Sequence, residues 1–409
     1  MARERLVVGI DVGSAKICTL IANVSEDDQL EIMGCGVARS EGLKKGVVVG
    51  VEEAARQIQS SVQKAEQQSG FKILSAFVSV SGSHIQTEST HGVATVRHQD
   101  ASVTEQDVAR AMEAARTLHL PLDRQLIDVV PRHFVVDGQE DITSPVGMVG
   151  HRLEVQTLAI TASRSALHNL TSCVDRAGVN IDALVLSPLA AAEATLTPTE
   201  RDIGVTLIDF GGGSTDLAVF LENSLAFSSV LPVGGSQITN DLAVRLRTPF
   251  SAAEEVKLRH GQAFVNQRED DRVIDVAGFE SDESQSVSVR LVIETIEDRL
   301  VDTFERVQDR LAKGGFEDSL PAGVVLVGGT AQLVAIRRLA TELLESPVRI
   351  GSPAGIFGLT DQISTPAFAT PVGLLKWGLA HEDGGGGAGG SFFSDAWASI
   401  QAWLRAFRQ

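Results

Sequence analysis

Short apolar runs alternate with longer polar segments along the chain, which is typical of an α/β protein. Segments 6–23 and 205–219 each contain a β-branched apolar run, a glycine turn and a second apolar run. Each segment therefore predicts a strand, a tight turn and another strand. Helices, either amphipathic or rich in small residues, are expected between the strands. They cover residues 51–69, 105–118, 164–177, 185–195 and 290–313.

The two glycine turns carry residues suited to binding phosphate. These residues are Gly13, Ser14 and Lys16 in the first turn, and Gly211, Gly212, Gly213, Ser214 and Thr215 in the second. Glycine lets backbone N–H groups approach a bulky anion, while the hydroxyls and the lysine add donors and charge. Because carboxylates repel phosphate, Asp209 and Asp216 beside the second turn predict a divalent metal between carboxylate and phosphate, and Asp11 beside the first turn would bind it together with Asp209. Either turn taken alone is equally well explained as an ordinary glycine hairpin.

An internal repeat makes the phosphate interpretation more specific. Superposing the two segments aligns Asp11 with Asp209 and Gly13 with Gly211, together with the strands on either side. Such a repeat predicts two similar half-domains that present their turns to a shared cleft. The two turns would then hold a polyphosphate from opposite sides.

Two further glycine pairs fit the same cleft. Gly234 and Gly235 end a strand and open a helix, which would direct the N–H groups of the helix start at an anion. Gly328 and Gly329 repeat this design after an apolar strand and before a helix that runs through Leu344.

Glu254 and Lys257 lie one helical turn apart, in a position to hydrogen-bond a ribose or a base edge. The alternative is a surface ion pair with no function, which is the commoner case for an isolated pair.

Five motifs follow one another along the chain. They are Asp11-x-Gly13 with Lys16, Ser187-Pro188-Leu189-Ala190-Ala191-Ala192, Asp209-x-Gly211-Gly212-Gly213-Ser214-Thr215-Asp216, Val327-Gly328-Gly329-Thr330 and Pro371-Val372-Gly373. This set resembles the nucleotide site of the actin, Hsp70 and sugar-kinase ATPase superfamily, and within it the FtsA family of bacterial cell-division proteins. The resemblance implies an α/β, actin-like ATPase fold with two related halves around a nucleotide cleft, each with an inserted subdomain. It also implies ATP and Mg²⁺ as cofactors.

The expected organisation follows from this resemblance and from changes in composition along the chain. The first half covers 1–83 and 161–201, the second half covers 202–231 and 303–380, the insertions cover 84–160 and 232–302, a glycine-rich linker covers 381–390 and an amphipathic helix covers 391–409. The first insertion contains no nucleotide motif. In the family that the chain resembles, a subdomain at this place takes part in polymer and divisome contacts.

One position departs from the superfamily pattern. Hsp70-like and polymerising actin-like ATPases have a glutamate just before the proline of the second motif, whereas this chain has Ser187 before Pro188. A hydroxyl is a poor general base at neutral pH. We therefore expect nucleotide binding with at most slow hydrolysis, and Glu193 is the substitute candidate for orienting the attacking water.

In the resembled family, the second insertion receives the C-terminal tail of the tubulin-like protein FtsZ, and Arg299 occupies the matching helix position. An arginine there either binds a carboxylate-rich peptide or pairs with Glu305 or Asp302 of its own helix. The sequence leaves both alternatives open.

The final segment is the most informative surface feature. After the glycine-rich linker, one face of a helix would collect Phe392, Phe393, Trp397, Ile400, Trp403, Leu404 and Phe407, with arginines beside it. Such a helix suits the interface of a membrane and is too polar to span it. The alternative is docking onto the protein's own core, but a packed terminal helix would not need so loose a tether.

Composition sets further bounds. The chain has 409 residues and a net charge of −18, which argues against nucleic acid as the main partner. Cys18, Cys35 and Cys173 are scattered and lack C-x-x-C spacing, so neither a disulfide framework nor a zinc site is supported. No stretch reaches a membrane-spanning length and the N-terminus lacks a signal sequence, so a cytosolic location is expected.

Together, these features favour one mechanism. ATP and Mg²⁺ would close the cleft and favour head-to-tail self-assembly. The arrayed tails would then hold the polymer on the cytoplasmic face of the inner membrane, where it tethers FtsZ and recruits later divisome membrane proteins. One alternative is a soluble small-molecule kinase of the sugar type, although only Asp209 is available as its catalytic carboxylate and the tail is then unexplained. Another, an Hsp70-like chaperone, would need a substrate-binding domain after the tail.

Overall fold

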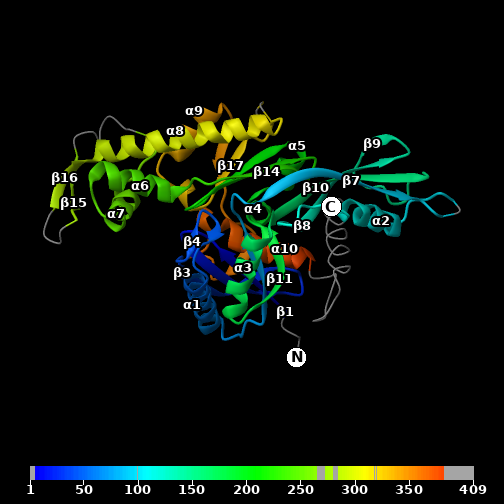
Figure 1. Cartoon of the computed structure of the whole chain (residues 1–409), viewed down its shortest axis with the longest axis horizontal. Coiled ribbons are helices and arrows are strands. Elements are labelled where there is room, and N and C mark those ends of the chain that lie inside the picture. The colour runs from blue at the N-terminus through cyan, green and yellow to red at the C-terminus, as the bar shows by residue number, and fades with distance from the viewer. Residues whose placement is uncertain are drawn as a thin grey trace.

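Two sheets of the same connectivity form the body of the protein, with the first half below the second in Figure 1. The computed structural model describes residues 5–98, 100–264, 272–279, 284–316, 318 and 320–381. The predicted linker and terminal amphipathic helix lie outside the described residues.

The strand order is equivalent in the two sheets. The first has the order β11 (Asn180–Leu186), β6 (Ser75–Val80), β1 (Arg5–Val12), β2 (Lys16–Val24), β3 (Leu30–Arg39) and β19 (Ile356–Gly358). The second, written in the matching direction, has the order β18 (Val348–Ile350), β17 (Val324–Val327), β12 (Val205–Phe210), β13 (Thr215–Leu221) and β14 (Ser224–Leu231). β1 thus corresponds to β12, and β19 has no counterpart in the second sheet. β1 and β12 each pair antiparallel with the next strand and parallel with a later one. This shared connectivity confirms the internal repeat.

Helices cover both faces of the first sheet. α1 (Val51–Ser69) and α3 (Arg164–Arg176) pack on one face, and α4 (Ser187–Thr195) and α10 (Ala369–His381) pack near the other. The predicted helix 51–69 is confirmed at both ends, and Gly70 after it has a left-handed φ of 78°. The helix expected at 185–195 begins only at Ser187, because the two residues before it complete β11. Short elements in this half are β4 (Leu43–Lys44), β5 (Val47–Val48) and η2 (Pro366–Phe368).

The first insertion forms a sheet of its own at the right of Figure 1. Its strands, in sheet order, are β7 (Gln86–Thr95), β10 (Arg152–Ser163), β8 (Arg124–Val136) and β9 (Gln139–Ile142), and α2 (Glu105–Arg116) packs against them. It also touches the second half. Thr87 donates to the carbonyl of Ser228 (3.0 Å), and Ser224 donates to the carbonyl of Pro131 (2.7 Å). Because β10 also packs against α3 of the first half, this subdomain contacts both halves of the protein.

The second insertion lies at the opposite end of the molecule, at the left of Figure 1. It contains α6 (Gly235–Leu246), α7 (Phe250–His260), β15 (Val273–Ala277), β16 (Ser284–Ser288) and the start of α8 (Val289–Lys313). α8 crosses the expected boundary at residue 302 without a break and joins the insertion to the core of the second half. The second half also contains α5 (Pro198–Ile203), η1 (Gly329–Gln332) and α9 (Ile336–Leu344). Among the described residues, no helix has the length and apolar character needed to cross a membrane.

Candidate functional site

Asp11 and Asp209 occupy equivalent places in the two sheets. Asp11 is the last but one residue of β1 and lies opposite Cys18 of β2. Asp209 is the last but one residue of β12 and lies opposite Asp216 of β13. The glycine turn that follows each aspartate therefore projects from the same end of the equivalent strand.

The two turns touch at positions where a side chain does not fit. A Cβ atom at Gly212 would lie 2.5 Å from the Cβ of Ala15, and one at Gly213 would lie 2.6 Å from the Cβ of Ser14. The Ser14 hydroxyl also accepts a hydrogen bond from the backbone N–H of Gly46 (2.8 Å), which fixes the first turn to its own half. The two predicted phosphate turns thus meet along one line of contact.

Both aspartates of the repeat accept a hydrogen bond from a hydroxyl group of another element. Ser79 of β6 donates to Asp11 over 2.8 Å, and its oxygen in turn accepts the backbone N–H of Val12. Thr370 of α10 donates to Asp209 over 2.9 Å. Each carboxylate is therefore oriented by a neutral donor rather than by a cation.

A third carboxylate, that of the buried Asp216, links the two halves directly. It accepts a hydrogen bond from Ser81, which follows β6 in the first half, over 2.6 Å. Ser214 of the second turn donates to the other oxygen over 3.1 Å. Asp216 is thus held from both sides of the line where the halves meet.

Burial disfavours the negative charge of all three carboxylates, and neighbouring carboxylates add to this effect at Asp209 and Asp216. Burial raises the pKa of Asp209 to about 7, and the charges of Asp216 and Asp11 act in the same direction. Burial likewise raises the pKa of Asp216 to about 6, and it raises the pKa of Asp11 above its ordinary value. Lys16 favours the charged forms of Asp11 and Asp209, but it does not offset burial. A divalent cation at this place would stabilise carboxylates that are otherwise costly to ionise.

The residues present fit a magnesium ion bound jointly with phosphate. Carboxylates and hydroxyls are the hard oxygen groups that Mg²⁺ prefers. Within the described part of the chain, no group of three or more His, Cys, Asp and Glu residues has the arrangement of a self-sufficient metal site. Mg²⁺ usually binds through one or two carboxylates together with phosphate and water, so Asp11 and Asp209 satisfy this requirement without further protein ligands.

The start of α6 does not have the predicted role. The N–H groups of Gly235 and Ser236 donate to the carbonyls of Gly211 (3.0 Å) and Gly212 (2.7 Å) of the glycine turn. The expectation that these N–H groups point at an anion is therefore wrong. A Cβ at Gly234 would lie 2.7 Å from the Gly211 carbonyl, so only glycine fits there. This close approach lets the start of α6 hydrogen-bond to the second glycine turn.

Gly328 and Gly329 differ in their surroundings. Gly328 has a φ of 87°, and a Cβ there would lie 2.4 Å from an oxygen of Asp209. At Gly329, by contrast, a Cβ would meet no atom within 4 Å, which leaves open space in front of it. The helix expected directly after this pair starts later, because a 3₁₀ turn covers Gly329–Gln332 and α9 begins at Ile336.

Lys257 is more than a surface charge. Its ammonium group donates to Glu254 (2.7 Å), to the Thr239 hydroxyl (2.8 Å) and to the Gly235 carbonyl (3.2 Å). Only 12% of the lysine side chain is exposed. The pair therefore ties α7 to the start of α6, close to the glycine turn that α6 supports.

The structure does not bring Glu193 to the carboxylate cluster. Ser187, at the start of α4, donates to the carbonyl of Val80 (3.2 Å), the last residue of β6, which also carries Ser79. Glu193 lies six residues further along the helix, about 9 Å away at 1.5 Å per residue. It forms an ion pair with Arg201 of α5 over 2.7 Å, next to the opposite end of β12.

Arg299 is paired within the protein. It contacts Asp241 of α6 over 2.5 Å and Asp302 of its own helix over 2.8 Å. Pairing with Asp302, one of the two alternatives, is thus confirmed, and the contact with Asp241 was not predicted. Any partner that binds Arg299 must compete with two carboxylates.

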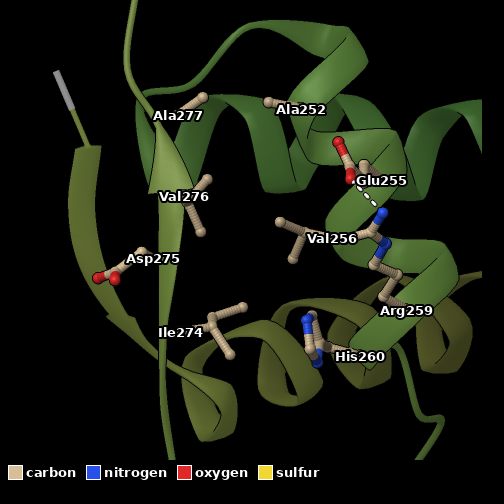
Figure 2. Close-up of a pocket in the computed structure, with 9 residues that line it drawn as sticks. All are labelled: Ala252, Glu255, Val256, Arg259, His260, Ile274, Asp275, Val276 and Ala277. Atoms are coloured by element: carbon tan, nitrogen blue, oxygen red, sulfur yellow. Dashed lines mark ion pairs between the residues drawn. The ribbon is translucent and has the colours of Figure 1, made fainter. Parts of the chain in front are cut away.

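A cavity of about 210 Å³ lies between α7 and β15 of the second insertion. Figure 2 shows Val256 and Val276 facing it, with Glu255 and Arg259 forming an ion pair (2.8 Å) on the helix. The cavity therefore combines an apolar floor with charged groups on one side, and it lies away from the carboxylate cluster.

Sequence reasoning missed the groups that hold the aspartates. Asp216 was predicted together with Asp209, and the hairpin register puts the two residues opposite each other. Ser79, Ser81 and Thr370 carry no local signal, since they come from 68, 135 and 161 residues away from the carboxylates that they contact.

Two equivalent half-sheets, with an aspartate and a glycine turn on each, define the actin-like class of ATPase folds. Solved structures agree with this class. The protein resembles a PilM–PilN type IV pilus biogenesis complex (TM-score 0.64, 17% identity, 91% of this chain and 98% of that chain). It also resembles MreB5 of Spiroplasma citri bound to ADP (TM-score 0.53, 15% identity, 93% and 99%) and a MamK double helical filament (TM-score 0.52, 12% identity, 91% and 98%).

The particular family follows from sequence comparisons. The family model "Cell division protein FtsA" matches residues 206–373, and "SHS2 domain inserted in FTSA" matches residues 82–161. Proteins described as "Cell division protein FtsA" are 38% identical in Pseudomonas aeruginosa (96% of this chain, 94% of that protein), 38% in Bacillus subtilis (92% and 84%) and 32% in Escherichia coli K12 (92% and 90%). The chain therefore belongs to the FtsA family of cell-division proteins. The expected fold class is confirmed, and the kinase alternative is not favoured.

Replacing Asp209 with Asn tests the carboxylate cluster. An acid whose pKa is raised on folding destabilises the folded state increasingly as pH rises from its unfolded pKa, near 4, through its folded pKa. We expect Asp209→Asn to stabilise the nucleotide-free protein at pH 8 in EDTA, and this gain should shrink steadily between pH 7 and pH 4. Urea unfolding at several pH values measures it. A stability difference that stays constant with pH would contradict the account.

Proposed function

We propose that this protein binds Mg·ATP between its two halves, assembles into polymers and tethers the FtsZ ring to the cytoplasmic face of the inner membrane. The observation that carries the proposal is the placement of Asp11 and Asp209 at equivalent strand ends whose glycine turns touch. In such a repeat, the glycine turns of the two halves can donate backbone N–H groups to the same phosphate from opposite sides. Family membership supports the role in division.

In this proposal, the phosphates lie among the glycine turns and the metal lies beside the two equivalent aspartates. The phosphate-binding residues are Gly13, Ser14, Lys16, Gly211, Gly212, Gly213, Ser214, Thr215, Gly328 and Gly329. Asp11 and Asp209 would bind Mg²⁺, which supplies positive charge to the phosphates. Glu254 and Lys257 would contact the nucleoside, and Gly234 and Gly235 would support the second turn. Relatives in fold support nucleotide binding, because MreB5 of Spiroplasma citri was solved with ADP and with AMPPNP.

Hydrolysis is proposed to be slow or absent. Ser187 provides only a hydroxyl at the start of α4, and that hydroxyl is already engaged with a backbone carbonyl. Glu193, the substitute candidate, is paired with Arg201 at the other end of the helix. ATP would therefore serve mainly to set the conformation of the cleft.

Self-assembly and recruitment form the second part of the proposal. A MamK double helical filament has the same fold, which supports polymerisation through actin-like contacts. The first insertion contacts both halves of the protein, so a change in their relative position would reach it. We propose that this subdomain contributes to polymer contacts and to binding later divisome membrane proteins.

Membrane attachment is assigned to the predicted terminal helix at 391–409. Each large apolar side chain that enters the membrane contributes roughly 1.5–3 kcal/mol before the helix is ordered. A single helix thus gives reversible attachment, while a polymer that arrays many helices gains about 10²–10⁴ in avidity. ATP-dependent assembly would in this way control residence at the division site.

Co-sedimentation with anionic liposomes tests this attachment. We expect the full chain to pellet with the liposomes, and to pellet more strongly with Mg·ATP, because assembly raises avidity. A version that ends at Gly390 should stay in solution under both conditions. Equal behaviour of the two versions would contradict the assignment of the tail and would reopen the soluble-kinase alternative.

The FtsZ tail is proposed to bind the second insertion near Arg299. The cavity between α7 and β15 adds an apolar surface in the same subdomain. Arg299 would exchange its contacts with Asp241 and Asp302 for carboxylates of the peptide. Such an exchange keeps the arginine paired in both states, so it avoids leaving a partly buried charge without a partner.

A synthetic peptide of the FtsZ C-terminal tail tests Arg299. We expect Arg299→Ala to weaken peptide binding about tenfold or more, since a charge-assisted hydrogen bond is lost. Arg306→Ala is the matched control, because Arg306 also pairs with Asp302 from the same helix. Fluorescence anisotropy measures binding, and thermal unfolding checks that both variants are folded. Equal binding by the two folded variants would rule out this role for Arg299.

A further inference from the structure

The segment 366–370, which consists of η2 and the first residues of α10, contacts the motifs of both halves. The carbonyl of Pro366 accepts a hydrogen bond from the N–H of Gly328 over 3.0 Å. The ring of Phe368 lies under the ammonium group of Lys16, which is 3.3 Å from the ring centroid. The expected organisation places this segment in the second half with the rest of 303–380, yet it lies against the first phosphate turn as well as against the glycine pair of the second half, and α10 packs on the first sheet.

Thr370, in the same segment, holds the Asp209 carboxylate on one side. Its hydroxyl donates to Oδ2 of Asp209 over 2.9 Å. On the other side, Gly328 lies so close that a Cβ there would be 2.4 Å from Oδ1. The carboxylate therefore has one oxygen fixed by a hydrogen bond and the other confined by backbone, so its plane cannot turn freely.

We propose that Thr370 is a positioning residue of the Mg·nucleotide site, whose hydroxyl orients Asp209 for the metal. This inference rests on the proposed function. Residues that hydrogen-bond a metal-binding carboxylate fix its orientation, and their loss typically lowers metal affinity by about 10–100-fold. Thr370 touches Asp209 and acts through it.

The chemical type of the donor suits this role. A lysine or arginine in contact with Asp209 would neutralise the carboxylate and compete with the cation. A hydroxyl orients the group and leaves its negative charge available. The first half has the same arrangement, because Ser79 donates to Asp11 over 2.8 Å from a different element.

The anchoring of α10 gives the hydroxyl a fixed position. A Cβ at Gly373, one turn after Thr370, would lie 1.7 Å from the carbonyl of Ala190 in α4, so the two helices are in close contact there. α10 also packs on β1, the strand that carries Asp11. Thr370 therefore joins the aspartate of the second half to a helix that belongs to the core of the first.

Titrating Mg²⁺ at a fixed concentration of a fluorescent ATP analogue tests the proposal with the full chain. We expect Thr370→Val, which keeps the side-chain shape and removes the hydroxyl, to raise the Mg²⁺ concentration for half-maximal binding about tenfold. Thr370→Ser keeps the donor and should restore the midpoint to within about twofold. Thr295→Val is the matched control, because Thr295 is also buried and donates to a backbone carbonyl of α8.

Three outcomes decide the matter. A higher Mg²⁺ requirement for Thr370→Val alone, with equal weak binding of all variants in EDTA, supports the positioning role. An unchanged midpoint, or an equal loss of binding with Mg²⁺ and in EDTA, overturns it while leaving the proposed function intact. Wild-type protein that binds the analogue without any dependence on Mg²⁺ overturns both. Thermal unfolding without nucleotide checks that the compared variants are folded.

Discussion

Three carboxylates clustered where the two halves meet, Asp209 and Asp216 buried and Asp11 half-buried, are the constraint on which the rest of this structure depends. Burial and mutual repulsion raise the pKa of Asp209 to about 7 and of Asp216 to about 6. Folding therefore favours the protonated, neutral forms of these groups. The pairing of β12 with β13 nevertheless holds Asp209 and Asp216 opposite each other. The surrounding hydroxyls orient the carboxylates and only partly counter the effect of burial. A bound cation is the simplest partner that would stabilise all three as anions.

The same constraint explains where the glycines and helices lie. The glycine turns allow backbones from the two halves to touch beside the carboxylates, and the start of α6 supports the second turn through two N–H groups. η2 and the start of α10 lie against both halves here, because Phe368 of η2 contacts Lys16 and Thr370 of α10 donates to Asp209. The insertions lie at opposite ends of the molecule, so partner surfaces can vary without disturbing the buried cluster (Figure 1).

The repeat was predictable from sequence because it is local. Asp11 and Asp209 each lie within a single hairpin, so aligning two short segments was enough to identify equivalent strand ends. The helix 51–69 was predictable at both ends for the same reason, with an apolar face and a terminal glycine. The contacts of Thr370 and Arg299 were not, because Asp209 lies 161 residues from Thr370 and Asp241 lies 58 residues from Arg299. The role of the α6 start was misjudged because a helix N-terminus binds carbonyl oxygens as readily as anions.

A double-mutant cycle on ATP affinity tests most directly whether the two halves form one metal-dependent site. The cycle compares wild type, Asp11→Asn, Asp209→Asn and the double variant by calorimetry, with Mg²⁺ and with EDTA. If both aspartates serve a single ion, each single variant should weaken binding in Mg²⁺, and the double variant should be little worse than either one. In EDTA the four proteins should bind alike. Losses that add independently, or that persist unchanged in EDTA, would contradict a shared metal site.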